Sequence, residues 1–239
     1  MYRFSTPLFL VCCALLLVVS YVIGAIVHAR QAAGKTVTLI DRAQQFPRQY
    51  SIGAGLPLRY LMLGDSTAMG VGCDRLEQTV AYHHAQILSQ SRNVEVTNLG
   101  VSGARLKDVL ANQLPLLSGK YDVITVLVGA NDATHLTDNQ SFWTDLQQLT
   151  AALSSQTSRL ILVTPPNFSG TSALPGFIRL LVTSRSYSER AAVLQSAGSA
   201  TVVDLYRDGH LQLNQFASDG FHPNASGYAL WASLFEHLL

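Results

Sequence analysis

Short apolar runs of strand length alternate with longer segments of helical period from Leu58 to the end of the chain. Continuous apolar runs of this kind are typical of strands that are buried on both faces. The strand candidates are 58–64, 94–100, 122–129, 159–165 and 200–205, and the helix candidates are 78–90, 104–117, 141–155, 176–197 and 224–239. Because strands that alternate with helices are joined by right-handed crossovers, the pattern predicts a three-layer α/β/α sandwich with about five parallel strands.

A single apolar stripe follows the predicted helix 141–155. Phe142, Leu146, Leu149 and Leu153 are spaced by four, three and four residues, which places them on one face of a helix. Such a stripe indicates packing against a sheet. We therefore assign these side chains to the hydrophobic core and not to a binding site.

The N-terminal part of the chain has a different pattern. Residues 4–27 contain no Asp, Glu, Lys, Arg or His, and as a helix these 24 residues would extend about 36 Å. A retained transmembrane helix over 1–28 is favoured over a cleaved signal peptide, whose apolar region is normally shorter, although "VHA" before Arg30 would suit cleavage. The prediction continues with a polar linker, 29–57, in which "KTVTLI" could add a short edge strand, and a folded domain, 58–239.

Two features of this N-terminal segment favour opposite orientations in a membrane. Arg3 precedes the apolar run and Arg30, Lys35 and Arg42 follow it, and this charge excess alone favours a cytoplasmic domain. The short leading tail resembles that of N-terminal signal anchors, which export the domain that they carry. We expect a membrane-anchored domain outside the cytoplasm, in the periplasm or at the cell surface, or a secreted one if the N-terminus is cleaved.

Composition and charge exclude several classes of function. The 239 residues are 48% hydrophobic and 13% charged, with a net charge of +1 and no basic run, so a nucleic-acid partner is not expected. The chain has no His-Glu-x-x-His, paired Cys-x-x-Cys or Gly-x-x-x-x-Gly-Lys motif, so we expect neither a metal nor a cofactor. Cys73 has no disulfide partner within the predicted domain and is interpreted as a packed residue.

Small and amide-bearing residues follow the first three predicted strands. "GDS" ends at Ser66, "NLGVSGAR" covers 98–105, and "GANDATH" covers 129–135. The carboxyl ends of parallel strands are where ligands gather in such sheets, and glycines there let backbone N–H groups approach a substrate. Near the end of the chain, Asp219 stands three residues before His222, a spacing that lets a carboxylate orient an imidazole. These residue types are those of a serine catalytic triad.

Together these segments resemble the SGNH hydrolase family, also called GDSL-type esterases and lipases, whose sequence blocks carry Ser, Gly, Asn and His in that order. The blocks match at Ser66 in "GDS", Gly103 in "NLGVSGA", Asn131 in "GAND", and Asp219 with His222 in "SDGFH". The similarity covers nearly the whole predicted domain. It implies a flavodoxin-like sandwich, which agrees with the fold predicted from the strand and helix pattern.

The resemblance also implies a role for each residue. Ser66 would be the nucleophile, His222 the general base and Asp219 the residue that orients it. Ser66, Gly103 and Asn131 would supply the donors of an oxyanion hole. The implied activity is hydrolysis of carboxylic esters through an acyl-enzyme on Ser66. The Gly-x-Ser-x-Gly motif that marks the common α/β-hydrolases does not occur in the chain.

Other polar residues near these blocks have simpler interpretations. Asp65 and Asp132 are expected to cap helices or fix loops. His135 follows the Asn131 block and could line the cleft, whereas the remaining histidines are expected to be structural.

The substrate is less determined than the reaction. The segment 165–190 carries Phe168, Leu174, Phe177, Ile178 and Leu181, which could form an acyl-binding wall or simply pack on the sheet. An envelope lipid or another acyl ester is the first hypothesis, and a carbohydrate O-acetyl ester is the main alternative. A catalytically silent envelope-binding module of the same fold is the alternative outside the enzymes. The oligomeric state is not predicted.

Overall fold

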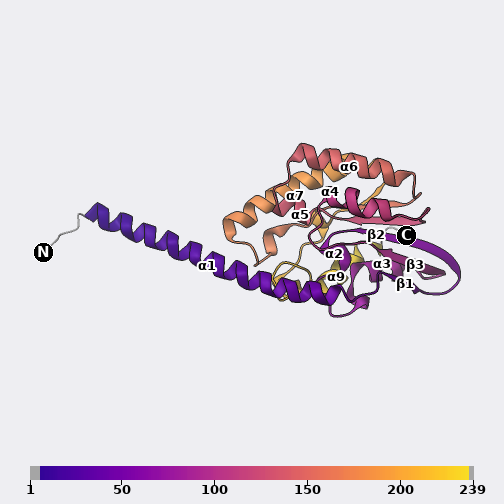
Figure 1. Ribbon diagram of the computed structural model, residues 1–239, viewed down its shortest axis with the longest axis horizontal. Helices are drawn as coiled ribbons and strands as arrows, with labels where there is room; N and C mark the ends of the chain where they lie inside the picture. Colours follow the sequence, from indigo (N-terminus) through magenta and orange to yellow (C-terminus); the bar gives the residue numbers. More distant parts are fainter. Residues whose placement is uncertain (1–5, 237–239) are drawn as a thin grey trace.

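The five apolar runs form the parallel part of a six-stranded sheet. The structure, a computed structural model, describes residues 6–236. The strand order is β1-β3-β2-β4-β5-β6, with β2 to β6 all parallel. The bounds of the parallel strands are Leu56–Gly64 for β2, Arg92–Asn98 for β3, Val123–Leu127 for β4, Leu160–Val163 for β5 and Thr201–Val203 for β6. The predicted three-layer α/β arrangement is therefore present around this sheet (Figure 1).

The five predicted parallel strands are present, but the prediction of a purely parallel sheet is wrong, because a sixth, antiparallel strand makes the sheet mixed. Strand β1 (Gln49–Ile52) pairs antiparallel with β3 at the edge of the sheet, from Gln49 opposite Thr97 to Ile52 opposite Val94. It is four residues long and alternates exposed with half-buried positions, so it carries no apolar run. A turn through Gly53 and Gly55, both with positive φ, then leads the chain into β2.

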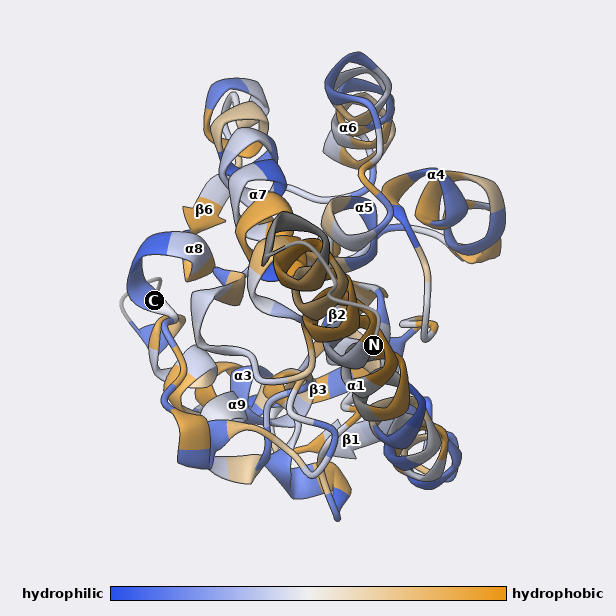
Figure 2. Ribbon diagram, turned by 90° about the vertical axis from the view of Figure 1, so that its left-hand side faces the viewer, coloured by the Kyte–Doolittle hydropathy of each residue, from blue (hydrophilic) through white to orange (hydrophobic). Residues whose placement is uncertain are grey.

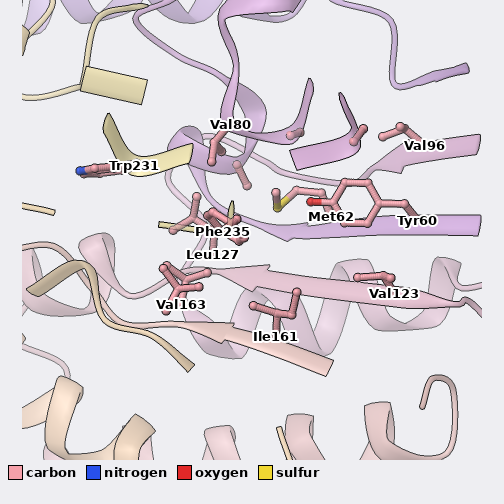
Figure 3. Close-up of a cluster of buried hydrophobic side chains, with 14 of the residues drawn as sticks. Tyr60, Met62, Val80, Val96, Val123, Leu127, Ile161, Val163, Trp231 and Phe235 are labelled. Atoms are coloured by element: carbon pink, nitrogen blue, oxygen red, sulfur yellow. The ribbon is translucent and has the colours of Figure 1, made fainter. Parts of the chain in front are cut away.

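Side chains of alternating positions on β2 enter two separate cores. Tyr60 and Met62 point to one face, where α3 (Val80–Leu88) and α9 (Ala225–Ser233) pack (Figure 3). Leu61 and Leu63 point to the other face. All four side chains are fully buried, as expected for a central strand covered on both sides.

The second face is covered by α4 (Leu106–Asp108), α6 (Asn139–Ser154) and α7 (Gly176–Ser196). The predicted stripe on α6 is confirmed, because Phe142, Leu146, Leu149 and Leu153 are all buried in this core. The shorter helices are α2 (Ser66–Met69), α5 (Ala130–Thr134) and α8 (Leu205–Asp208), with 3₁₀ or π turns at Leu76–Gln78, Val109–Gln113, Leu114–Leu116, Phe168–Gly170 and Leu213–Gln215.

The N-terminal helix corrects a second part of the fold prediction. Helix α1 spans Thr6–Ala43, and its first turns extend away from the domain (Figure 1) and are mostly hydrophobic (Figure 2). No helix within residues 6–236 is long and apolar enough to cross a membrane, so the predicted transmembrane helix is wrong. The uncharged run is only the first part of α1, which continues without a break through Arg30, Lys35 and Arg42. Residues 1–5 of the predicted span lie outside the described residues.

Regular structure and buried contacts occupy the segment expected to be a polar linker. Residues 29–43 are helical, and "KTVTLI" lies inside α1 instead of forming a strand. Leu39 and Ala43 are buried against Met69, the last residue of α2, and Val71, which stands two residues further along the chain. Arg42 adds an ion pair with Asp74. The last turns of α1 therefore pack on the domain next to α2.

Candidate active site

Ser66 lies at the sharp turn between β2 and α2. Gly64 ends the strand with a φ of +150°, and a Cβ at this position would lie 1.8 Å from the carbonyl oxygen of Leu127 on β4. Only glycine lets the two strands end this close together. The chain leaves β2 for β3 on one side and later reaches β4 on the other, so Ser66 lies where the strand order reverses. This is the usual ligand position in open α/β sheets.

Asp65 fixes the first turn of α2, as expected for a capping residue. Its Oδ1 accepts hydrogen bonds from the backbone N–H of Thr67 at 2.8 Å and from Thr67 Oγ1 at 2.6 Å. Burial raises the pKa of Asp65 to about 6, against the lowering effect of these two hydrogen bonds. The N-cap bond holds Ser66 as the first residue of the helix, where its backbone N–H has no intrahelical acceptor.

The loop before α9 brings Asp219 and His222 to Ser66. His222 Nε2 lies 2.8 Å from Ser66 Oγ, and His222 Nδ1 lies 2.6 Å from Asp219 Oδ2. The exposed fractions are 4% for Ser66, 4% for His222 and 3% for Asp219. The structure therefore joins these three residues into one buried hydrogen-bonded chain, although Ser66 and His222 are 156 positions apart in the sequence.

The environment of Asp219 determines which nitrogen of His222 carries the proton. Burial raises the pKa of Asp219, but the hydrogen bond and charge of His222 and the backbone N–H groups of Phe221 and His222 outweigh it, so that the pKa lies below its ordinary value. An ionised carboxylate can only accept hydrogen bonds, so the proton lies on Nδ1. Nε2 is then the acceptor for the hydroxyl proton of Ser66.

Gly103 lies in the loop that follows β3, and Asn131 lies in the first turn of α5, which follows β4. Gly103 has a φ of +82°, which disfavours other residues, and apart from its two chain neighbours no residue of the described chain has an atom within 4 Å of the place a Cβ would take. Asn131 Nδ2 donates to the carbonyl oxygen of Ala104 at 3.0 Å, which joins the start of α5 to the loop that carries Gly103. An amide has two N–H bonds, so Asn131 retains a second one. Among the described residues, the backbone N–H groups of Ser66 and Gly103 have no hydrogen-bond acceptor.

Several supporting residues were not singled out from the sequence. Asn98 donates to the carbonyl oxygen of Ala68 at 2.8 Å and accepts from the N–H of Gly100 at 2.9 Å, which ties the glycine loop to α2. Gln113 forms two hydrogen bonds with the backbone of Gly64, at 3.0 and 2.7 Å. The available sequence signal for Asn98 was an amide side chain at the end of an apolar run. No such pattern marked Gln113.

The predicted loop-fixing role of Asp132 is confirmed, because its Oδ2 accepts from the backbone N–H of Leu106 at 2.9 Å. His135 is exposed at the end of α5, and its Nδ1 lies 2.8 Å from the carbonyl oxygen of Asn131, so its bond is within its own helix. Cys73 is fully buried and its pKa is raised by burial, in agreement with a packed residue.

Most of the apolar segment after β5 is used for packing. Phe168 is buried with Ala130 and Ala133 of α5, and Leu174 and Ile178 pack against the same cluster. The backbone N–H of Ser172 donates to the carbonyl oxygen of Gly220, so the segment also borders the loop that carries Asp219 and His222. Phe177 and Leu181, at the start of α7, are 59% and 53% exposed.

An open pocket of about 220 Å³ lies beside Gly103. Its lining comprises Val101, Ser102, Gly103, Ala104, Asp108, Asn112 and Gln113. Apolar and backbone atoms make up the larger part of this lining, and the side chains of Ser102, Asp108 and Asn112 add hydroxyl, carboxylate and amide groups that could bind the hydroxyl groups of a ligand.

The arrangement has the components of acyl-transfer chemistry. It combines a hydroxyl that is hydrogen-bonded to an imidazole with a carboxylate that is hydrogen-bonded to the other nitrogen of that imidazole. The backbone N–H groups of Ser66 and Gly103 add donors that have no acceptor among the described residues. A hydroxyl becomes a strong nucleophile when an adjacent base removes its proton, and fixed donors stabilise the oxyanion that forms.

Comparison with known proteins agrees with this chemistry. The model of the GDSL-like lipase/acylhydrolase family matches residues 62–230. The chain is 25% identical over 237 residues to the GDSL-like esterase Rv1075c of Mycobacterium tuberculosis, covering 89% of this chain and 73% of that one.

Solved structures share the fold at low sequence identity. The acetylxylan esterase Axe2 of Geobacillus stearothermophilus is similar with a TM-score of 0.58 and 19% identity, covering 78% of this chain and 95% of that one. LAE5, an α/β hydrolase from the metagenome of Lake Arreo, is similar with a TM-score of 0.57 and 19% identity, and the match covers 76% of this chain and 94% of LAE5.

Proposed function

The chain belongs to the GDSL-like lipase/acylhydrolase family and is a carboxylic ester hydrolase, and on this premise we propose that it acts through an acyl-enzyme on Ser66. The observation that carries the proposal is the hydrogen-bonded chain from Ser66 Oγ through His222 to Asp219, with distances of 2.8 and 2.6 Å. A fold that only bound a ligand would have no need of a base held against a buried serine. This favours catalysis over a silent binding module.

In the proposed mechanism, Ser66 Oγ attacks the ester carbonyl while His222 Nε2 takes the hydroxyl proton. Asp219 holds Nδ1–H and stabilises the imidazolium that forms. His222 then gives the proton to the leaving alcohol, and the acyl group remains on Ser66. A water molecule activated by His222 releases the acid and restores the serine.

Three donors are proposed to stabilise the tetrahedral oxyanion. They are the backbone N–H groups of Ser66 and Gly103 and the second N–H of the Asn131 amide. The positive φ of Gly103 and the bond from Asn131 to Ala104 hold the latter two in place before substrate binds. Loss of one such donor typically lowers kcat about 100- to 1,000-fold.

The proposed substrate is a short-chain acyl ester of a polar alcohol, such as an acetylated saccharide. The side chains of Ser102, Asp108 and Asn112 in the pocket beside Gly103 offer hydrogen-bond partners to a hydroxyl-rich alcohol. The packing of Phe168 and Ile178 against α5 leaves less of the segment after β5 for a long acyl chain. The acetylxylan esterase activity of one structurally similar enzyme agrees with this choice.

A longer acyl chain, as in a lipid, is the second candidate. Phe177 and Leu181 are exposed on the first turns of α7, close in the chain to the segment that borders Gly220. These two side chains offer an apolar surface to which an extended acyl group could bind.

The first experiment measures hydrolysis of p-nitrophenyl acetate, butyrate and octanoate by the full chain. Ser66→Ala and His222→Ala are expected to abolish hydrolysis, because one removes the nucleophile and the other its base. Asn131→Ala is expected to lower kcat about 100- to 1,000-fold with a small change in KM. Ser154→Ala and His210→Ala, at exposed positions outside the site, serve as matched controls and retain full activity.

Chain length and alcohol then distinguish the two substrate classes. A preference for acetate, with release of acetate from acetylated xylan oligosaccharides, supports the saccharide ester. A preference for octanoate that is lost in Phe177→Ser and Leu181→Ser overturns it in favour of the lipid ester. Full activity of folded Ser66→Ala would refute the acyl-enzyme mechanism itself.

A further inference from the structure

Helix α1 contributes a side chain to the hydrogen bonds around Asp219. Thr36 Oγ1 lies 3.0 Å from Asp219 Oδ2, although the two residues are 183 positions apart in the sequence. Oδ2 is the same oxygen that accepts from His222 Nδ1. A residue far outside the four sequence blocks therefore contacts the carboxylate that orients His222.

The bond from Thr36 completes the set of donors on this carboxylate. Oδ1 accepts from the backbone N–H groups of Phe221 at 2.9 Å and His222 at 3.1 Å. Oδ2 accepts from His222 Nδ1 and Thr36. An ionised carboxylate has about four acceptor positions, and all four are used here. Among the described residues, Thr36 provides the one donor to Asp219 that does not come from its own loop.

Two acceptors lie within hydrogen-bond distance of the Thr36 hydroxyl, and the negative charge of Asp219 determines which one it donates to. Its Oγ1 is also 3.0 Å from the carbonyl oxygen of Ala32, one turn earlier in α1. A hydroxyl has one proton, and hydrogen bonds to ionised acceptors are about twice as strong as those between neutral groups. The proton therefore goes to Asp219.

Packing holds Thr36 at this distance. Leu39 and Ala43, three and seven residues further along α1, are buried against Met69 and Val71. Between α1 and the Asp219 loop lies a cavity of about 170 Å³, whose lining includes Ala32 and Lys35 of α1 together with Ser218, Asp219 and Gly220. Without the Thr36 hydroxyl, this side of the carboxylate would meet a polar cavity instead of a fixed donor.

We propose that Thr36 is a positioning residue for ester hydrolysis, which holds the Asp219 carboxylate in the orientation that His222 requires. The proposal rests on the proposed function, since it assigns Thr36 a role through Asp219. It also makes the last turns of α1 part of the active site. An ester hydrolase domain beginning at Leu58 would lack this contact.

The test replaces the Thr36 hydroxyl in the full chain and measures steady-state hydrolysis of p-nitrophenyl acetate. Thr36→Val keeps the shape of the side chain, and we expect kcat to fall about 10- to 150-fold, the factor that corresponds to one hydrogen bond to a charged group. KM is expected to stay within about twofold, because Thr36 is proposed to act on Asp219 and not on the substrate. Thr36→Ser, which restores the hydroxyl, is expected to recover most of kcat.

Thr38→Val is the matched control. Thr38 is exposed on the same helix, and its hydroxyl faces only the carbonyl oxygen of Gly34 at 3.5 Å. It is expected to keep the wild-type kcat. A fall in kcat shared equally by Thr36→Val and Thr36→Ser would indicate packing and overturn the proposal.

A proton NMR spectrum provides a readout that a merely structural role would not change. The proton between His222 Nδ1 and Asp219 Oδ2, which are 2.6 Å apart, is expected to give a far-downfield signal. In Thr36→Val, Oδ2 loses its second donor, so this signal is expected to move further downfield. An unchanged signal together with an unchanged kcat would overturn the role of Thr36.

Ser66→Ala and His222→Ala in the same series separate the two proposals. If both abolish hydrolysis while Thr36→Val keeps the wild-type kcat, only the role of Thr36 fails. If both remain active in folded protein, the acyl-enzyme mechanism fails and the role of Thr36 fails with it.

Discussion

Glu189 on α7 is buried without a hydrogen bond to either of its side-chain oxygens in the described part of the chain. It is 1% exposed, and burial, with a smaller effect from the negative charge of Asp132, raises its pKa to about 9. An acid whose pKa is raised on folding binds more protons in the folded than in the unfolded state between its two pKa values. Stability is therefore lost as the pH rises from about 4.5 to 9.

Glu189→Gln is expected to remove this loss, because the amide does not ionise. At pH 8 the variant should exceed the wild type by about 1–3 kcal/mol in free energy of unfolding, whereas at pH 5 the two should be nearly equal. Urea denaturation at both pH values measures the difference. The raised pKa of Asp65 acts in the same direction but is present in both proteins, so it cancels.

Glu95→Gln, at an exposed position on β3, is the control and should show no such pH-dependent gain. If Glu189→Gln destabilised the protein equally at pH 5 and pH 8, the buried carboxyl would be held by contacts that the amide cannot make. The ionisation argument would then be wrong.

Helices α7 and α8 are linked by a largely buried ion pair. Arg190 donates to both carboxylate oxygens of Asp204, with distances of 2.7 to 2.9 Å, and Thr164 donates to the same carboxylate. Burial acts to raise the pKa of Asp204, but the bond from Arg190 prevails and lowers it. Asp204 caps the start of α8, and Asp208, the last residue of that helix, pairs with Arg207 at the surface.

Asp204→Asn is expected to lower the free energy of unfolding by about 1–3 kcal/mol at pH 7, because it leaves Arg190 without its carboxylate. The difference from the wild type should shrink near pH 3, since a carboxyl with a lowered pKa stabilises the fold only while it is ionised. Asp208→Asn should unfold like the wild type, because exposed pairs contribute little. Urea denaturation compares the three proteins, and equal effects of the two substitutions would contradict this account.

Helices and strands with a long run or stripe of apolar residues could be predicted from the sequence. Those that form through contacts with residues far away in the sequence could not. The central strands and α6 have continuous or striped apolar positions. Strand β1 alternates exposed with half-buried residues, and its pairing partner, β3, lies about 45 positions away. "KTVTLI" contains β-branched residues typical of a strand, yet it is helical because Leu39 and Ala43, four residues apart, then face Met69 and Val71.

The same division holds within the active site. Ser66, Asp219 and His222 stand in short motifs whose residue types limit the possible chemistry, so they could be proposed before the structure. Thr36 and Gln113 act through bonds that span 183 and 49 positions, and no local pattern marks either residue. Their positions follow from how whole elements pack.

At the scale of the whole molecule, α1 connects an exposed apolar segment to the loop that carries Asp219 and His222. Its first turns carry exposed residues such as Leu16 and Leu17, whereas its last turns bury Leu39 and bring Thr36 to Asp219. The buried cluster around Leu39 is small, so this part of α1 is expected to detach more easily than the central sheet.

Leu39→Asp is expected to detach the last turns of α1, because it places a charge against Met69 and Val71. Amide hydrogen exchange over residues 36–43 should then become faster, while the central strands stay protected. If Thr36 acts through Asp219, kcat should fall by about the same factor as in Thr36→Val. Val37→Asp, at a position 56% exposed on the same helix, should change neither quantity. A detached helix with an unchanged kcat would show that α1 and the triad act independently.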